Sequence, residues 1–160
     1  IRQYDIANGE GIRTSIFVTG CTHCCYNCFN EEYQDFNAGK EWTDKETQLV
    51  VSYVKDPTCA GLTLLGGEPF QTVDGMLAIV KSVLEAAPEK PICAYSCYVW
   101  DDIISDPSRC SLVEQIDILV DCRFVDELKD PSLRFRGSSN QRIIDVQSSL
   151  KQGEVVLAME

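Results

Sequence analysis

Four cysteines fall within eight residues of this chain, in the segment CTHCCYNC at positions 21–28. Cys21, Cys25 and Cys28 follow the spacing C-x3-C-x2-C, and Cys24 lies between them. Thiolate ligands select soft or borderline metals, chiefly zinc, copper(I) and iron–sulfur clusters. The segment therefore predicts a metal or iron–sulfur site.

The spacing of these cysteines bears on which metal they bind. A structural zinc site could use two C-x2-C pairs, but zinc sites usually take their pairs from separated knuckles and so join two parts of the chain. An electron-transfer cluster also takes four cysteines, at spacings that differ from this one. Three cysteines at x3 and x2 would leave one iron of a cluster open, and an open iron is a place for a substrate.

The remaining cysteines are scattered. The chain has nine in total, an odd number, and its first residues lack the apolar core of a secretion signal, so thiols are expected rather than disulfides. Cys59, Cys93 and Cys110 are predicted to be small buried hydrophobic residues, because cysteine is among the most often buried residue types. Clustered thiols in a reducing cytoplasm indicate a metal site or redox chemistry.

Length and charge limit the classes of protein that are possible. A chain of 160 residues with 44% hydrophobic residues suits one core, so a single domain over residues 1–160 is expected. The net charge of -11 disfavours nucleic acid as a partner. The apolar runs are shorter than the roughly 18 residues that a membrane span requires, so we expect no membrane partner and a cytoplasmic location.

The elements that must position the cysteines alternate between strands and helices. Four apolar runs predict strands: SIFVTG from Ser15, GLTLLGG from Gly61, ICAYSCY from Ile92 and DILVDCR from Asp117. This alternation predicts an α/β fold with a mainly parallel sheet. Since a full eight-fold β/α barrel needs about 250 residues, any barrel here must be small, partial and open.

Two helices are predicted between these strands. The first follows Thr43, which forms a capping box with Glu46, and presents Leu49, Val50 and Tyr53 to the core. The second has apolar residues at helical spacing and stops before Pro88; these residues are Met76, Ile79, Val80, Val83 and Leu84. A third helix is predicted after Ser139, and a last strand in EVVLAM.

Four distinctive segments follow the predicted strands directly. They are the cysteine segment, GGEP at 66–69, SCY at 96–98 and CRF at 122–124. In parallel α/β sheets, binding groups gather at the carboxyl ends of the strands. We therefore expect all four segments to meet at one edge of the sheet.

With both motifs in place, the chain resembles the radical S-adenosylmethionine superfamily. C-x3-C-x2-C after one strand and GGEP after the next carry this resemblance. Within the superfamily the chain is similar to the activating proteins of anaerobic ribonucleoside-triphosphate reductase, through NGEGIR, GCTHCCYNCFN, TLLGGEPF and FRGSSNQRIIDVQ. The matching segments run from about Asn8 to Leu150.

The resemblance implies a cofactor and an activity. Cys21, Cys25 and Cys28 would hold a 4Fe-4S cluster, and the amino and carboxylate groups of S-adenosylmethionine would bind its fourth iron. Reductive cleavage of S-adenosylmethionine would give a 5′-deoxyadenosyl radical, which would take a hydrogen atom from a glycine of the reductase. The implied partners are that reductase and a one-electron donor such as flavodoxin or ferredoxin.

Further residues receive roles from the same resemblance. Gly66 and Gly67 would let the backbone approach S-adenosylmethionine, Glu68 would add a carboxylate for its ammonium group, and the carbonyl of Asn27 would accept from its adenine. Ser96 and Asp121 are candidates for contacts to its ribose or methionyl end. Two alternatives stay open: an activase of another glycyl-radical enzyme such as pyruvate formate-lyase, and a non-catalytic metal or electron-carrier module.

For the last group of candidates, a structural role is favoured over a role in catalysis or ligand binding. Cys24 is expected to be a bystander and His23 to pack or hydrogen-bond within the loop. Cys97 and Cys122 stand where this branch would have glycine, and we expect them to replace a small buried residue. Three arginines, Arg134, Arg136 and Arg142, could pair with the S-adenosylmethionine carboxylate or with the partner protein, or form structural ion pairs.

Overall fold

The structure, a computed structural model, describes residues 1–28 and 30–159 and contains one seven-stranded sheet. The strands lie side by side in chain order from β1 to β7. Their bounds are β1 Arg2–Asp5, β2 Arg13–Val18, β3 Leu62–Gly66, β4 Ile92–Tyr95, β5 Ile118–Asp121, β6 Arg142–Asp145 and β7 Leu157–Met159. In the described residues β1 and β7 form the two edges, so the sheet is open.

The sheet is mixed rather than uniformly parallel. The three pairings from β2 to β5 are parallel, as predicted for the four central strands. The outer pairings, β1 with β2, β5 with β6 and β6 with β7, are antiparallel. The α/β class is thereby confirmed, and the parallel part forms the middle of the sheet.

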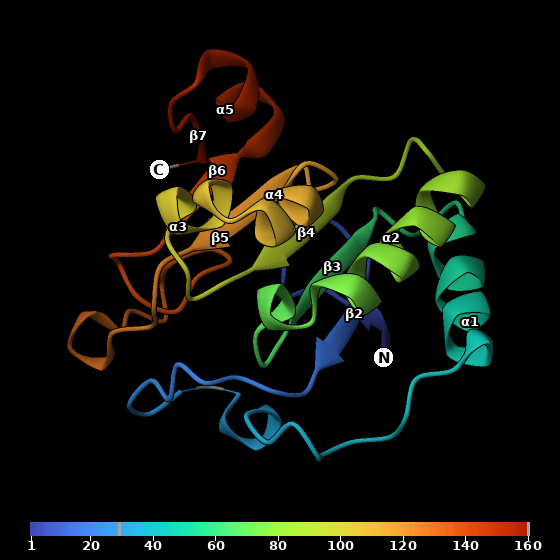
Figure 1. The fold of residues 1–160 in the computed structure, drawn as a ribbon, viewed down its shortest axis with the longest axis horizontal. Helices are drawn as coiled ribbons and strands as arrows, with labels where there is room; N and C mark the ends of the chain where they lie inside the picture. The colour runs from blue at the N-terminus through green and yellow to red at the C-terminus, as the bar shows by residue number, and fades with distance from the viewer. Residues whose placement is uncertain (29, 160) are drawn as a thin grey trace.

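Five α-helices accompany the sheet: α1 Asp44–Lys55, α2 Val73–Ala86, α3 Trp100–Ser105, α4 Pro107–Val113 and α5 Val146–Gln152. Three short 3-10 turns span Glu31–Tyr33, Pro69–Gln71 and Asp126–Leu128. In Figure 1, α2 and α4 lie in front of the central strands, and the segment that contains the cysteines runs below the end of β2. The cysteine segment therefore lies at the carboxyl end of the parallel strand β2.

The core lies between the parallel strands and helices α1 to α4. Ile16, Leu62, Leu64, Ile92 and Leu119 are each at most 2% exposed. Burial of such side chains contributes about 1.5–3 kcal/mol each relative to exposure. The continuous apolar runs that predicted these strands therefore reflect strands packed within the core.

The capping box predicted for the first helix is confirmed. The Thr43 main-chain N–H donates to Glu46, and the Thr43 hydroxyl accepts from the main chain at the start of α1. The buried face of α1 differs from the prediction, because Val50 and Val54 are buried while Leu49 is 42% exposed. The apolar face is therefore rotated toward Val54.

The carboxyl-terminal third of the chain contains elements that sequence patterns did not reveal. The helix expected after Ser139 is preceded by strand β6, and α5 begins at Val146, where Asp145 accepts from the Ser148 N–H. The last strand is confirmed as the short β7. Strand β6 has the sequence RIID, with only two apolar residues, so it lacks the continuous apolar run that predicted β4 and β5. None of the helices in the described part of the chain has the length and apolar character needed to cross a membrane.

Candidate functional site

A cavity of about 470 Å³ opens at the carboxyl ends of β2, β3 and β4. Its lining includes the three spaced cysteines, both glycines of GGEP and the start of SCY; these residues are Cys21, Cys25, Cys28, Gly66, Gly67 and Ser96. The fourth segment reaches the cavity through Phe124. The predicted convergence of the four segments at one edge of the sheet is confirmed.

Main-chain hydrogen bonds hold the cysteine loop in place. The Gly20 N–H donates to the Tyr33 carbonyl at 2.8 Å, and the Cys21 N–H donates to the Gln34 carbonyl at 3.0 Å. The Cys28 N–H donates to the Cys25 carbonyl at 3.2 Å. The first two bonds join the two ends of the loop, and Cys21 and Cys28, seven residues apart in sequence, both reach the cavity.

Cys24 differs from the three cysteines around it. It is exposed, has a φ of 51°, and is absent from the described residues that line the cavity. Its exposure and its absence from the described lining separate Cys24 from Cys21, Cys25 and Cys28. This placement agrees with the bystander role predicted for it.

Close packing requires both glycines of GGEP, Gly66 against the main chain of β2 and Gly67 against the cysteine loop. Gly66 has a φ of +104°, and a Cβ on Gly67 would lie 2.6 Å from the Gly20 carbonyl oxygen and 2.7 Å from that of Tyr33. The Gly67 N–H donates to the Val18 carbonyl, and the Glu68 N–H donates to the Gly20 carbonyl. Glycine is needed here first for the fit between β3 and the cysteine loop.

The Glu68 side chain is fully buried and surrounded by groups of the protein. Its Oε1 accepts from the Ser96 hydroxyl at 3.0 Å and from the Cys97 N–H at 2.7 Å, and its Oε2 accepts from the Phe70 N–H at 3.0 Å. Glu68 does not belong to the described cavity lining. Its carboxylate therefore joins the ends of β3 and β4.

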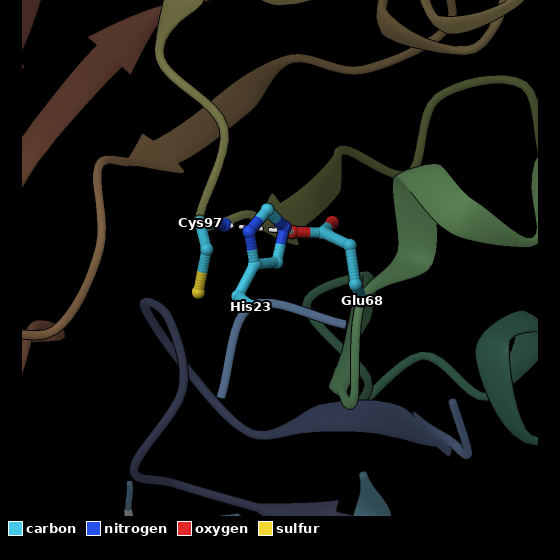
Figure 2. A group of neighbouring side chains, drawn as sticks. All are labelled: His23, Glu68 and Cys97. Atoms are coloured by element: carbon cyan, nitrogen blue, oxygen red, sulfur yellow. Dashed lines mark hydrogen bonds and ion pairs between the residues drawn. The ribbon is translucent and has the colours of Figure 1, made fainter. Parts of the chain in front are cut away.

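His23 brings the cysteine loop to the same carboxylate. Its side chain is 6% exposed, and Nε2 lies 3.0 Å from Glu68 Oε1, although the ring N–H is not aligned for a hydrogen bond. The Tyr98 ring packs edge-on against the imidazole with centroids 4.6 Å apart. Figure 2 shows His23 and Glu68 directed toward each other, with the Cys97 sulfur directed away from the carboxylate. The packing role predicted for His23 is confirmed, but its partner Glu68 was not foreseen.

Cys97 lies with the spaced cysteines at the cavity, at the strand end where the sequence places the SCY segment. Its Sγ lies 3.8 Å from Cys25 Sγ, and it is half-buried rather than buried. A hydrogen bond with the Cys97 thiol lowers the pKa of Cys21 to about 6, whereas that bond and burial raise the pKa of Cys97. The signal available in the sequence was the position of Cys97 directly after a parallel strand.

Asp121 is engaged by an arginine instead of facing the cavity. Its buried carboxylate accepts from Arg142 Nε at 3.0 Å and Nη2 at 2.5 Å, and from the Trp100 N–H at 2.9 Å. Cys122 is half-buried; burial and the neighbouring Asp121 raise its pKa to about 11. Of the roles open to Arg142, the structure favours a structural ion pair.

The other candidates lie in varied surroundings. Asn27 is exposed, has a φ of 54° and is absent from the described cavity lining. Arg136 lines the cavity and donates to the Gln141 carbonyl at 2.7 Å, while the Arg134 guanidinium lies over the Phe135 ring. Cys59 and Cys93 are buried as predicted, but Cys110 is half-buried and donates to Glu114.

The far wall of the cavity comes from segments to which sequence reasoning gave no site role. Asn8 precedes β2, and Leu133 and Gln141 belong to the long connection between β5 and β6. Gln141 fixes this connection, since its Oε1 accepts from the Gly137 and Ser138 N–H groups. The NGEGIR and GSSNQR segments that carry the family resemblance thus both reach the cavity wall.

Comparison with known proteins agrees with this site. The family described as "4Fe-4S single cluster domain" matches residues 7–144, which include every described element from β2 to β5 and the three spaced cysteines. The chain belongs to this class of single-cluster iron–sulfur proteins.

Individual relatives identify a family within this class of iron–sulfur proteins. A protein of Haemophilus influenzae is 38% identical over 143 residues, covering 87% of this chain and 91% of the relative. One of Pasteurella multocida is 36% identical over 87% of this chain and 90% of its own length, and one of Salmonella typhimurium is 36% identical over 86% and 90%. All three are named anaerobic ribonucleoside-triphosphate reductase-activating protein. This chain belongs to the family of anaerobic ribonucleoside-triphosphate reductase-activating proteins.

Proposed function

We propose that the protein is a radical S-adenosylmethionine enzyme that generates a glycyl radical on anaerobic ribonucleoside-triphosphate reductase. The observation that carries this proposal is the shared cavity: Cys21, Cys25 and Cys28 line it together with Gly66 and Gly67. Three thiols on one side and a glycine-rich turn on the other suit a cluster with one open iron and a small ligand beside it. Membership of the activating-protein family supports the choice of reductase.

The chemistry of the donors fits a cluster. Cys21, Cys25 and Cys28 supply soft thiolate ligands from a loop that main-chain hydrogen bonds have already folded. The Asn30 N–H donates to Cys28 Sγ at 3.4 Å, and such hydrogen bonds to sulfur tune the potential of a cluster. The three spaced cysteines are the proposed ligands, and exposed Cys24 is left outside the set.

The cavity also offers groups for S-adenosylmethionine. At about 470 Å³ it falls within the range of small-molecule sites, and it is lined by the Leu65 and Gly66 main chain, Ser96 and Arg136. We assign the ligand contacts to Gly66, Gly67 and Ser96. Glu68 then acts as a positioning residue, since its carboxylate already receives three hydrogen bonds from the protein.

The cofactors would supply the radical chemistry. An electron passed through the cluster would cleave S-adenosylmethionine reductively, and the fragment formed would take a hydrogen atom from a glycine of the reductase. The protein contributes the cavity that excludes water and orients the ligand. A one-electron donor such as flavodoxin or ferredoxin would provide the electron in the cytoplasm.

The open sheet suits a protein substrate. We propose that residues 1–160 form a single domain with a partial β/α barrel, in which β1 and β7 leave a lateral mouth. A flexible glycine loop of a folded partner could enter such a mouth, whereas a closed barrel would exclude it. A free glycine-containing peptide should therefore be processed much more slowly than the folded reductase.

The test is an anaerobic assay of the chain after reconstitution with iron and sulfide. We expect reductant-dependent release of 5′-deoxyadenosine and, with the reductase present, a glycyl radical detected by electron paramagnetic resonance. A glycyl radical on pyruvate formate-lyase but not on the reductase would favour the alternative activase. Zinc-loaded protein with no cluster and no cleavage would favour the metal or electron-carrier module and overturn the proposal.

A further inference from the structure

We propose that Cys97 is a fourth thiolate ligand that occupies the open iron of the cluster when S-adenosylmethionine is absent. This inference rests on the proposed function, because it assumes a cluster on Cys21, Cys25 and Cys28. It adds a resting state in which four cysteines enclose the cluster. S-Adenosylmethionine must then displace a protein ligand before it can react.

The placement of Cys97 carries the proposal. Its Sγ lies 3.8 Å from Cys25 Sγ. All four thiols line the same cavity. Cys97 follows the end of β4, so it reaches the three proposed ligands from a different part of the chain than the cysteine loop. Four thiolates that converge from two segments form the usual ligand set of a closed 4Fe-4S cluster.

The main chain around Cys97 fixes the direction of this approach. The Cys97 N–H donates to Glu68 Oε1 at 2.7 Å, and the preceding Ser96 donates its hydroxyl to the same oxygen at 3.0 Å. Figure 2 shows that the sulfur is directed away from this anchored side. The anchoring therefore holds the Cys97 thiol at the cavity, beside Cys25.

The exchange requires no oxidation or reduction. When Cys97 binds iron, its thiol releases one proton; when the amino and carboxylate groups of S-adenosylmethionine bind that iron, the iron–sulfur bond breaks and the thiolate takes up a proton. The cysteine loop offers a matched control, because Cys24 is a thiol of the same loop that is exposed and lies outside the described lining.

Iron retention tests the proposal without any activity assay. Wild type, Cys97→Ala, Cys97→Ser and Cys24→Ala would be reconstituted anaerobically without S-adenosylmethionine and treated with one equivalent of ferricyanide per cluster. Wild type and Cys24→Ala should keep four irons, because each iron is held by the chain. Both Cys97 variants should lose one iron and show the paramagnetic resonance signal of a 3Fe-4S cluster. Equal loss of iron from wild type and Cys97→Ala would overturn the proposal.

Ligand affinity gives a second readout. If Cys97 occupies the iron in nine molecules of ten, the apparent Kd of wild type for S-adenosylmethionine should be about tenfold weaker than that of Cys97→Ala. Equal affinities would contradict the competition. A Cys25→Ala arm separates the two proposals: if that variant retains a full cluster, the proposed ligand set fails, whereas failure of Cys97 alone leaves the activase assignment intact. Metal-free Cys97→Ser and wild type are compared by thermal unfolding to verify that both are folded.

Discussion

The imidazole of His23 lies 3.0 Å from the buried carboxylate of Glu68, so the cysteine loop and the GGEP segment meet through two side chains. The same carboxylate accepts from Ser96 and Cys97 at the end of β4 and from Phe70. Three chain segments that border the cavity are therefore joined at one buried acidic group.

Replacing Glu68 should destabilise the metal-free protein as well as disturb the site. Glu68→Ala removes the acceptor for three donors, and each buried donor left without a partner costs about 1–3 kcal/mol. We expect the free energy of unfolding to fall by at least about 2 kcal/mol, measured by chemical denaturation. Glu68→Gln keeps an acceptor oxygen and should lose less. If the free energy of unfolding of Glu68→Ala lies within about 0.5 kcal/mol of wild type, Glu68 does not hold the three segments together.

The two glycines at 67 and 75 should respond in opposite directions to alanine. Gly67→Ala places a Cβ 2.6 Å from the Gly20 carbonyl oxygen and should cost about 1–3 kcal/mol through overpacking. Gly75 lies exposed in α2, where a Cβ would meet Thr72 at an ordinary 3.6 Å, so Gly75→Ala should raise stability by about 0.5 kcal/mol. Thermal unfolding of both variants measures the contrast. Equal effects would show that close approach does not explain the glycine at 67.

Asp121 should matter for stability and little for ligand binding. Its carboxylate is held by Arg142 and the Trp100 N–H, so Asp121→Ala should cost about 2–3 kcal/mol, less than a fully buried pair because Arg142 is 38% exposed. Affinity for S-adenosylmethionine should change less than about threefold in a calorimetric titration of the reconstituted protein. A tenfold loss of affinity for S-adenosylmethionine, with an unchanged free energy of unfolding, would instead show that Asp121 contacts the ligand. The double mutant with Arg142→Ala should be less destabilised than the sum of the single variants.

Substitution of neighbouring cysteines should separate ligands from bystanders. Cys24→Ser should leave the iron content near that of wild type, because Cys24 is exposed and absent from the described lining of the cavity. Cys25→Ser should fall well below the iron content of wild type, because it removes one of the three ligands proposed in the cysteine loop. Iron and sulfide analysis after identical anaerobic reconstitution measures the difference. Equal loss in both variants would mean that the ligand set is wrong.

In the metal-free protein, the alkylation rates of Cys21 and Cys122 should reflect their shifted pKa values. The thiolate is the reactive form. The pKa of Cys21 is lowered to about 6, so its alkylation by iodoacetamide should rise through pH 6 and level off above about pH 7. The pKa of Cys122 is raised to about 11, so it should react slowly at neutral pH. Mass spectrometry of the labelled peptides follows both.

A pair of variants tests whether Cys97 is the cause of the lowered pKa of Cys21. Cys97→Ala removes the hydrogen bond that lowers the pKa of Cys21, so the midpoint of its alkylation should move to higher pH. Cys24→Ser leaves that bond in place and should leave the midpoint unchanged. A Cys21 rate in wild type that still increases in proportion to hydroxide at pH 8 would be at odds with the lowered pKa.

The sequence by itself determined the four central strands, the cap at Thr43 and the three spaced cysteines. These features depend on local chemistry: continuous apolar runs, a capping box three residues long, and ligand spacing within one loop. The convergence of the cysteine and GGEP segments also followed from sequence, because the carboxyl ends of parallel strands share one edge of the sheet. Strand β6 was not predicted, because its sequence RIID places only two apolar residues between charged ones.

Only the tertiary structure decided what each polar side chain contacts. Glu68 and Asp121 were expected to face S-adenosylmethionine, yet Glu68 accepts from Ser96 and Cys97, and Asp121 accepts from Arg142. Glu68 and Cys97 are 29 positions apart in sequence, and Cys25 and Cys97 are 72 positions apart, so spacing along the chain does not encode these contacts. A buried carboxylate must find donors wherever the fold brings them, and that is set by packing across the sheet rather than by neighbours along the chain.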